Sequence, residues 1–245
     1  MNDQARDRAQ SFGSVAPDYD RYRPGYPEAA ASLFPSLTGR KVADVGAGTG
    51  LLTSFLVGLG AQVTAIEVDP AMTDVLRSKA PAATVLLGAA ESLPLRDASM
   101  DVVACSSAWH WFAQPAGESE FARVVRPGGH VFALWNGFDE DATWIEEIRQ
   151  LREPNRQSPL ARRQRAADFC DEWFRNVTQL KLPWTWSRTV DDVIGLFGTF
   201  SGLLAQKGDD RTRVLAEVRE RLADHVVNGR LDLPMAVRGT TAIRQ

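Results

Sequence analysis

The residues best suited to chemistry lie in one short stretch, where an apolar run ends in a glycine-rich turn. The stretch reads Val42-Ala43-Asp44-Val45-Gly46-Ala47-Gly48-Thr49-Gly50. Glycines adopt positive φ and let a ligand approach the backbone, and a helix that starts after such a turn offers unpaired N–H groups. Glu67 ends the next apolar run, where a carboxylate can accept hydrogen bonds from both hydroxyls of a ribose. The pattern predicts a nucleoside-binding turn, and the alternative is a tight turn that holds no ligand.

The spacing of the glycines narrows the kind of ligand. The order is G-x-G-x-G, and Leu51 stands where a dinucleotide fingerprint has its third small residue. Asp44, shortly before the first glycine, would repel a pyrophosphate but can meet a cationic amine. It can instead fix the turn through backbone N–H groups without contacting a ligand. The stretch therefore disfavours a nicotinamide-dependent oxidoreductase, which is the first alternative function.

The composition limits what the rest of the chain can be. Its 245 residues are 44% hydrophobic and 24% charged with a formal net charge of −3, which is typical of one globular domain over 1–245. No apolar run approaches the roughly 18 residues that cross a bilayer, and the polar N-terminus lacks a signal core. The two cysteines and three histidines lack metal-site spacing, and the slightly acidic balance disfavours nucleic-acid binding. We expect a cytoplasmic protein that uses no metal, membrane or nucleic acid; its oligomeric state is not predicted.

Short apolar runs alternate with helix-length segments from Lys41 onward, which is the pattern of a parallel α/β sheet. The expected strands are 42–45, 63–68, 83–87, 100–104 and 130–134. A helix is expected over 51–59, and Asp69-Pro70 should cap another that ends at Lys79. Pro127-Gly128-Gly129 should form the turn before the fifth strand. These elements would bring the glycine turn and Glu67 to the same edge of the sheet.

Two further regions flank this core. Residues 1–35 form an expected N-terminal cap segment, with a short helix after Pro27. Residues 139–226 form an expected helical lid, with helices over 139–175, from a capping box at Thr189 to about Leu204, and over 211–226. A further strand is expected at 177–182, and the final strand at 232–243.

Several of these motifs together resemble the class I S-adenosylmethionine-dependent methyltransferases, over about residues 12–135. Asp44 to Gly50 is similar to the family's first motif, and Glu67 to its ribose-binding acid. The other matches are Gly88-Ala89-Ala90-Glu91-Ser92-Leu93-Pro94 with Asp97 and Ser99-Met100-Asp101, and Arg126-Pro127-Gly128-Gly129. The resemblance implies a Rossmann-like α/β fold, with a seven-stranded, mostly parallel sheet flanked by helices and an antiparallel final strand. It implies S-adenosylmethionine as the cofactor.

The resemblance also implies cofactor-binding roles for individual residues. The residues that it places around the methionine part are Asp44, Gly46, Ala47, Gly48 and Gly50, with Ser106 nearby. Glu67 would bind the ribose, while Val68 and the backbone of Ala90 would meet the adenine. Many relatives carry Asp where this chain has Ala89, so Glu91 or backbone groups would substitute there. An N-terminal segment that folds over the cofactor would let Tyr19 or Arg23 reach its carboxylate, and the alternative for both is surface packing.

The run after the fourth expected strand bears on the methyl acceptor. Ser106-Ser107-Ala108-Trp109-His110-Trp111-Phe112 lacks the Asn/Asp-Pro-Pro-aromatic motif of relatives that methylate the amino groups of bases. Together with Tyr19-Asp20-Arg21-Tyr22-Arg23-Pro24 it looks like the small-molecule branch, which includes trans-aconitate and quinone-biosynthesis methyltransferases. We expect in-line methyl transfer to a small-molecule acceptor. The second alternative is a non-catalytic protein that binds S-adenosylmethionine.

His110 is the candidate catalytic residue, because an imidazole suits general-base work near neutral pH. It can instead position the cofactor or substrate, or only pack between its neighbours. The tryptophans at 109, 111 and 135, with 184 or 186, could line an aromatic acceptor site, and core packing is the alternative for each.

Overall fold

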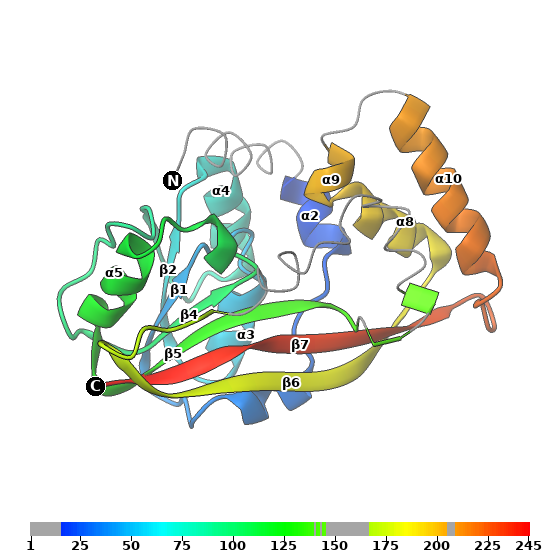
Figure 1. The fold of residues 1–245 in the computed structure, drawn as a ribbon. Helices are drawn as coiled ribbons and strands as arrows, with labels where there is room; N and C mark the ends of the chain where they lie inside the picture. Colours follow the sequence, from blue (N-terminus) through cyan, green and yellow to red (C-terminus); the bar gives the residue numbers. More distant parts are fainter. Residues whose placement is uncertain (1–15, 140, 143, 146–166, 205–208) are drawn as a thin grey trace.

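The computed structural model describes residues 16–139, 141–142, 144–145, 167–204 and 209–245. Its centre is a seven-stranded sheet with the order β3-β2-β1-β4-β5-β7-β6 (Figure 1). The strands are β1 (Lys41–Val45), β2 (Gln62–Glu67), β3 (Thr84–Leu87), β4 (Met100–Ser106), β5 (Val125–Phe138), β6 (Phe174–Arg188) and β7 (Leu231–Arg244). Strands β1 to β5 pair in parallel, whereas β7 is antiparallel to both β5 and β6. The mostly parallel sheet with an antiparallel final strand is thereby confirmed.

The strand order reverses at β1, which pairs with β2 on one side and β4 on the other. In open α/β sheets, ligands bind beyond the carboxyl ends of the strands at such a reversal. The residues at these ends are Val45 on β1, Glu67 on β2 and Ser106 on β4. The topology therefore gathers the residues that the sequence singles out.

Helices and two apolar clusters cover the two faces of the sheet. The helices here are α3 (Leu51–Gly58), α4 (Pro70–Lys79), α5 (Ala116–Val124) and the 3-10 helix η2 (Glu28–Leu33). One cluster joins Leu52 and Leu56 of α3 to Phe132 of β5, and another joins Phe121 of α5 to Val103 of β4. Helix α4 begins as expected, since Asp69 Oδ1 accepts from Ala71 N at 2.9 Å and Pro70 occupies the first turn.

A second group of helices lies at the far end of the long strands. It consists of α8 (Val190–Gly198), α9 (Ser201–Leu204) and α10 (Asp209–Ala223), and α2 (Ala16–Tyr22) lies beside it (Figure 1). Its own apolar cluster joins Phe197 of α8 and Leu222 of α10 to Leu233 of β7. The capping box at Thr189 is present, because the Thr189 side chain accepts from Asp192 N at 3.2 Å. We call α8, α9 and α10 the lid helices.

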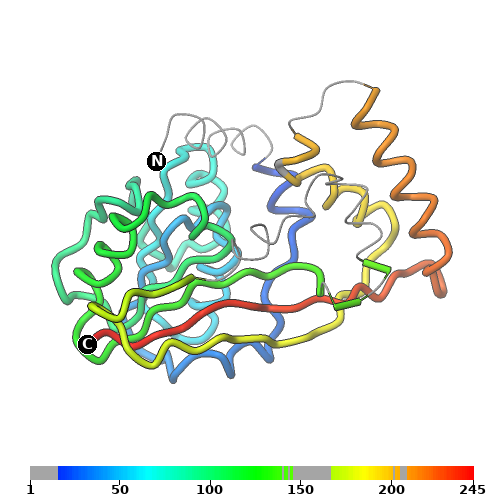
Figure 2. The backbone as a smooth tube through the Cα atoms, in the orientation of Figure 1, coloured from blue at the N-terminus to red at the C-terminus, as the bar shows by residue number. Residues whose placement is uncertain are grey.

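The last three strands are longer than the apolar runs indicated. Figure 2 shows β6 and β7 side by side from near the C-terminus to the lid helices, in agreement with their register from Phe174↔Arg244 to Arg188↔Leu231. Polar residues extend these strands because the ladder supplies their backbone hydrogen bonds. The expected turn at Pro127 lies inside β5 as a bulge: Met100 pairs with Val125 but Val102 already pairs with His130.

The expected lid over 139–226 is not continuous. Residues 146–166 lie outside the described residues, 167–173 form no helix, and β6 joins the sheet over Phe174–Arg188. The prediction of a helix over 167–175 is therefore wrong. From Phe174 onward the chain pairs with β7, and farther along the strand its residues alternate between exposed and partly buried with period two, as in a strand. The helix expected from Thr189 to Leu204 is interrupted after Gly198, where Thr199 closes α8 before α9 starts.

Candidate active site

The glycine turn after β1 is held against β2 by its own backbone. Gly46 N donates to Ile66 O at 2.8 Å, and Ala47 N donates to the same oxygen at 3.1 Å. Gly46, Gly48 and Gly50 have φ of 68°, 56° and 87°, in the left-handed region that favours glycine. A Cβ on Gly46 would lie 2.7 Å from the Cβ of Ala108, whereas one on Gly48 would meet nothing within 4 Å. The turn is thus packed at its start and open at Gly48.

Glu67 fastens this turn to the end of β2. Its Oε2 accepts from Gly48 N at 2.8 Å, and its Oε1 accepts from Val68 N at 2.8 Å and from Asp69 N at 3.0 Å. Burial raises the pKa of the Glu67 carboxyl, and the three backbone donors oppose that shift. The carboxylate that resembles the ribose-binding acid therefore also shapes the turn.

Asp44 is a fully buried carboxyl with one oxygen unsatisfied. Its Oδ2 accepts from Thr53 Oγ1 at 2.6 Å, and its Oδ1 has no hydrogen-bond partner. Burial raises the pKa of Asp44 to about 7, and the nearby charge of Glu67 adds to the rise. Buried carboxylates are normally paired, so a cationic group beside Asp44 would satisfy it. Thr49 Oγ1 and Asp69 Oδ2 are further buried, unpartnered atoms around the turn.

The loop between β3 and β4 is braced from α5 and from the loop after β4. Glu91 Oε1 accepts from Ala113 N at 2.7 Å, so the expected stand-in for an adenine partner also holds the loop that carries His110. Arg123 donates to the backbone oxygens of Leu93 and Leu95 at 3.0 and 2.8 Å. Ala90 is buried in this braced loop.

Ser106 at the end of β4 has a partner that sequence reasoning missed. Tyr26 Oη donates to Ser106 Oγ at 2.6 Å, and the Tyr26 ring stacks on Phe55 of α3 at 5.3 Å between centroids. The next residue, Ser107, has a φ of 55°, which is strained for a residue other than glycine. Backbone strain of this kind is common at functional sites. The available signal was Tyr26 in the aromatic and arginine-rich segment before Pro27.

His110 lies on the short 3-10 helix η3 (Trp109–Trp111) that follows β4. It is exposed, and its ring centroid is 4.8 Å from that of Trp111 and 6.5 Å from that of Trp135. The indole Nε1 of Trp135 is buried without a hydrogen-bond partner. Trp109, in contrast, packs on Phe121 at 5.3 Å and belongs to the apolar core, as the packing alternative predicts.

Trp184 and Trp186, the other tryptophans considered for the acceptor site, lie on β6 near the lid helices. Trp186 is buried in the cluster of the lid helices, and Trp184 Nε1 donates to Asn136 Oδ1 at 3.2 Å. Both have packing roles in the structure. The tryptophans that remain beside His110 are Trp111 and Trp135.

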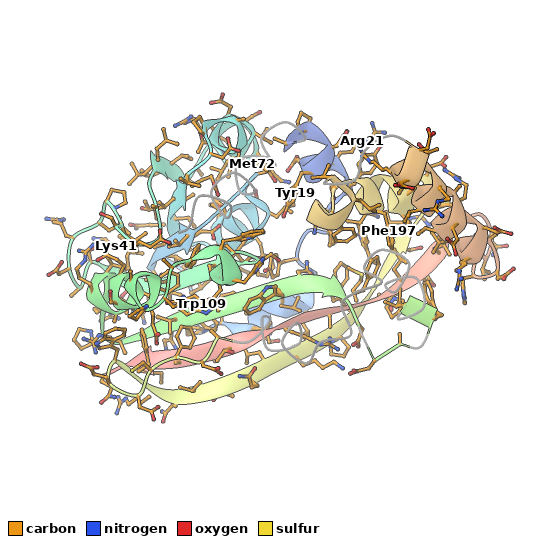
Figure 3. The ribbon with its side chains drawn as sticks, turned by 45° about the horizontal axis from the view of Figure 1, so that its top comes forward. Tyr19, Arg21, Lys41, Met72, Trp109 and Phe197 are labelled. Carbon is orange, nitrogen blue, oxygen red and sulfur yellow. The ribbon has the colours of Figure 1, made fainter. Side chains whose placement is uncertain are left out.

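Tyr19 and Arg23 come together, with the lid helices as their neighbours. Arg23 Nε donates to Thr199 Oγ1 at 3.0 Å, and its Cζ lies 4.7 Å from the Tyr19 ring centroid and 4.3 Å from that of Phe200. Figure 3 shows Tyr19 between Met72 of α4 and Phe197 of α8. Burial lowers the pKa of Arg23. Thr199 and Phe200 carry no sequence signal for this role, because they lie far along the chain.

Comparisons with known proteins bear on this geometry. A profile described as "Methyltransferase domain" matches residues 43–133. An uncharacterised methyltransferase from Mycobacterium tuberculosis is 38% identical over 220 residues, which are 90% of this chain and 88% of that protein. The chain belongs to the class I S-adenosylmethionine-dependent methyltransferases. This methyltransferase is also similar to a malonyl-acyl-carrier-protein O-methyltransferase from Serratia marcescens, at 35% identity over 125 residues, 49% of each chain.

A solved structure shares the fold of this methyltransferase. It comes from Anaeromyxobacter dehalogenans, is described as a type II methyltransferase and has 24% identity, with a TM-score of 0.63. The match covers 91% of this chain and 97% of that one. S-adenosylmethionine is the cofactor, and the oxidoreductase alternative is excluded.

The residues present fit that cofactor. S-adenosylmethionine carries an ammonium and a sulfonium, and the unpartnered Oδ1 of Asp44 offers a buried negative partner to such a cation. Within the described part of the chain, no group of three potential metal ligands is close enough to hold a metal ion. No helix of that part is long and apolar enough to cross a membrane.

Proposed function

We propose that this methyltransferase transfers the methyl group to a small-molecule acceptor at the carboxyl ends of β1, β2 and β4. The observation that carries the proposal is the buried Asp44 carboxyl with one free oxygen, beside a glycine turn that is open at Gly48. S-adenosylmethionine supplies an electrophilic methyl group when it is bound. The chain has to align the acceptor with that methyl group and exclude water.

The proposed cofactor contacts follow the polarity of each group. Asp44 and the backbone from Gly46 to Gly50 hold the aminopropyl part, with the Ser106 hydroxyl nearby. Glu67 accepts from the ribose through Oε2, which keeps a lone pair beside its single backbone donor, whereas Oε1 already accepts from two backbone N–H groups. Val68 and the Ala90 backbone flank the adenine, and Glu91 or backbone groups stand in for the acid that Ala89 replaces, while Glu91 Oε1 also holds the loop that carries His110.

Arg23 is proposed to pair with the cofactor's carboxylate, with Tyr19 against its guanidinium. No carboxylate of the described residues bonds to Arg23, whose two side-chain hydrogen bonds both go to Thr199. A half-buried guanidinium with no counter-ion among the described residues favours an anionic ligand, since a fork of N–H donors matches a carboxylate.

His110 is proposed to act at the acceptor. Its ring is exposed beside Trp111, and it follows the strand end that carries Ser106. As a base it would take the acceptor's proton; as a positioning group it would only orient the acceptor. A carboxylate acceptor, as in the Serratia relative's name, needs no base, so carboxylic acids are the first class to test. The cytoplasmic location and the lack of a nucleic-acid partner stay predictions, which cell fractionation and binding assays test.

The decisive experiment is a thermal-shift titration with S-adenosylhomocysteine, run beside NAD, on the wild type and Glu67→Gln. A ligand at about 100 times its dissociation constant stabilises the fold by roughly 2.7 kcal/mol. We expect S-adenosylhomocysteine to raise the melting temperature of the wild type and to have a weak effect on Glu67→Gln. Turnover with a panel of small carboxylic acids, phenols and amines then distinguishes an enzyme from a non-catalytic binder. A shift with NAD alone would contradict the proposal.

A further inference from the structure

The guanidinium of Arg23 makes both of its side-chain hydrogen bonds to the lid, whereas Tyr19 of its own segment stacks against it. Its Nε donates to Thr199 Oγ1 at 3.0 Å, and its Nη2 donates to Thr199 O at 3.1 Å. The Phe200 ring lies under the same group, at 4.3 Å from Cζ to the ring centroid. Thr199 is 1% exposed and closes α8, with its hydroxyl donating to Leu196 O at 2.7 Å. The lid therefore sets the direction of the Arg23 side chain.

This arrangement leaves one side of the guanidinium for another partner. The Nε–Nη2 edge is used by Thr199, and Nη1 bonds to none of the described residues. Burial lowers the pKa of Arg23, so the protein bears a cost for keeping the charge there. An anion at the remaining edge would offset that cost.

Helix α2, which leads into Arg23, contacts both the cofactor side and the lid side. Asp20 forms an ion pair with Lys79 at the end of α4. The start of α4 is capped by Asp69, two residues after Glu67, so this helix connects α2 to the cofactor side. Tyr22 packs on Gly195 of α8 so closely that a Cβ there would lie 2.5 Å from the Tyr22 ring. A change in the position of α2 would therefore be felt by α4 and by α8 together.

We propose that Thr199 is a positioning residue that aims Arg23 at the cofactor's carboxylate, and that this contact couples cofactor binding to the docking of α8 and α9. The inference rests on the proposed function, because it needs Arg23 to receive that carboxylate. Binding of the carboxylate and closure of the lid then reinforce each other, as coupling between two sites requires.

The test compares Thr199→Val with Thr199→Ser, since valine keeps the shape without the hydroxyl and serine keeps the hydroxyl. Two ligands are titrated by calorimetry: S-adenosylhomocysteine, and 5′-methylthioadenosine, which lacks the amino acid part. Loss of a hydrogen bond to a charged group predicts roughly 10-fold weaker binding of S-adenosylhomocysteine to Thr199→Val. Thr199→Ser should bind it like the wild type, and 5′-methylthioadenosine should bind all three proteins equally.

Hydrogen exchange gives an independent reading of the lid. S-adenosylhomocysteine should slow exchange over 190–204 in the wild type and Thr199→Ser, but not in Thr199→Val, and 5′-methylthioadenosine should slow it in none. Phe200→Leu keeps both hydrogen bonds between Arg23 and Thr199, and it should weaken the binding of S-adenosylhomocysteine and its effect on exchange by a smaller amount. This variant replaces Thr199→Val in the test if Thr199→Val does not fold. Equal weakening of both ligands, or unchanged binding of S-adenosylhomocysteine to Thr199→Val, would overturn the inference. If the wild type binds neither ligand, the proposed function itself fails.

Discussion

Asp44 has one carboxyl oxygen bonded to Thr53 and one without a partner, in a site that excludes water. Its pKa of about 7 means that near neutral pH the cofactor-free protein holds this carboxyl partly protonated. A cation bound beside it favours the ionised form, so the pKa must fall when the cofactor binds. Binding should therefore release a proton.

We predict that the affinity for S-adenosylmethionine rises with pH up to about 7 and levels off above it, because Asp44 is then already ionised. Calorimetry in buffers of different ionisation enthalpy measures the released proton. The ammonium of the cofactor also titrates, so Asp44→Asn serves as the control. The pH dependence of the affinity in that variant is the part that does not come from the Asp44 carboxyl. The same pH dependence in both proteins would contradict the assignment of Asp44.

The raised pKa of Asp44 also affects the stability of the cofactor-free protein. Its folded pKa lies above the value of about 3.9 in an unfolded chain, so the folded state keeps the proton to higher pH. The free energy of unfolding should therefore fall as pH rises from about 4 to about 7. In Asp44→Asn the free energy of unfolding should fall less over this pH range. Urea denaturation of both proteins at a series of pH values measures the difference.

His110 separates two kinds of catalysis. If it removes a proton, His110→Asn should lower kcat by roughly 100-fold or more and leave the dissociation constant of S-adenosylhomocysteine unchanged. We predict this result for acceptors that lose a proton, and little change in kcat for carboxylate acceptors. Steady-state kinetics with one acceptor of each class measures it. A higher KM with unchanged kcat for both classes would show that His110 only positions the acceptor.

At the scale of elements, two of the three glycines in the turn between β1 and α3 have contrasting surroundings. Gly46 has the Ala108 side chain against it, whereas Gly48 faces open space, and both have positive φ. An added Cβ at Gly46 brings a clash and backbone strain, and one at Gly48 brings strain alone. The second would occupy the space that we assign to the cofactor.

We predict that Gly46→Ala lowers the free energy of unfolding by roughly 2–4 kcal/mol and Gly48→Ala by roughly 1–2 kcal/mol. Gly48→Ala should nevertheless lose most of its affinity for S-adenosylhomocysteine. Urea denaturation and calorimetry on the pair measure the two effects separately. Near-normal binding by Gly48→Ala would mean that the cofactor does not approach the backbone there.

At the scale of the molecule, the sheet core and the lid helices have separate apolar clusters. Phe132 belongs to the cluster between the sheet and α3, and Phe197 to the cluster under the lid helices. Strand β7 spans both regions, since it pairs with β5 along one part and carries Leu233 into the lid cluster. We therefore expect the lid to open locally while the sheet stays folded.

We predict that Phe197→Leu speeds hydrogen exchange in α8 and α10 and changes β1 and β4 little. Phe132→Leu, also nearly fully buried, should lower the global free energy of unfolding by roughly 1–3 kcal/mol and speed exchange everywhere. Native-state exchange read by mass spectrometry compares the two variants. Uniform acceleration by Phe197→Leu would mean that the lid and the sheet unfold as one unit.

Much of the fold and of the cofactor turn could be predicted from sequence, because the signals are local. The glycines at 46, 48 and 50 need positive φ, and Asp69-Pro70 caps a helix within its own first turn. The runs that became β1, β2 and β4 are mostly buried, so their apolar composition marks them, whereas β3 is apolar but partly exposed. The alternation of apolar runs and helix-length segments predicted the parallel sheet, whereas its seven strands and the antiparallel final strand came from the resemblance, which rests on the same local motifs.

The tertiary structure alone decided the contacts between residues far apart in the chain. Arg23 and Thr199 are 176 positions apart, and Tyr26 and Ser106 are 80 apart, so no local pattern joins them. The full length of β6 depends on its ladder with β7, since its exposed residues carry little apolar signal. The amino-acid sequence predicts which residues are suited to bind the cofactor. Packing decided which of them meet, because burial and pairing depend on what the fold brings alongside.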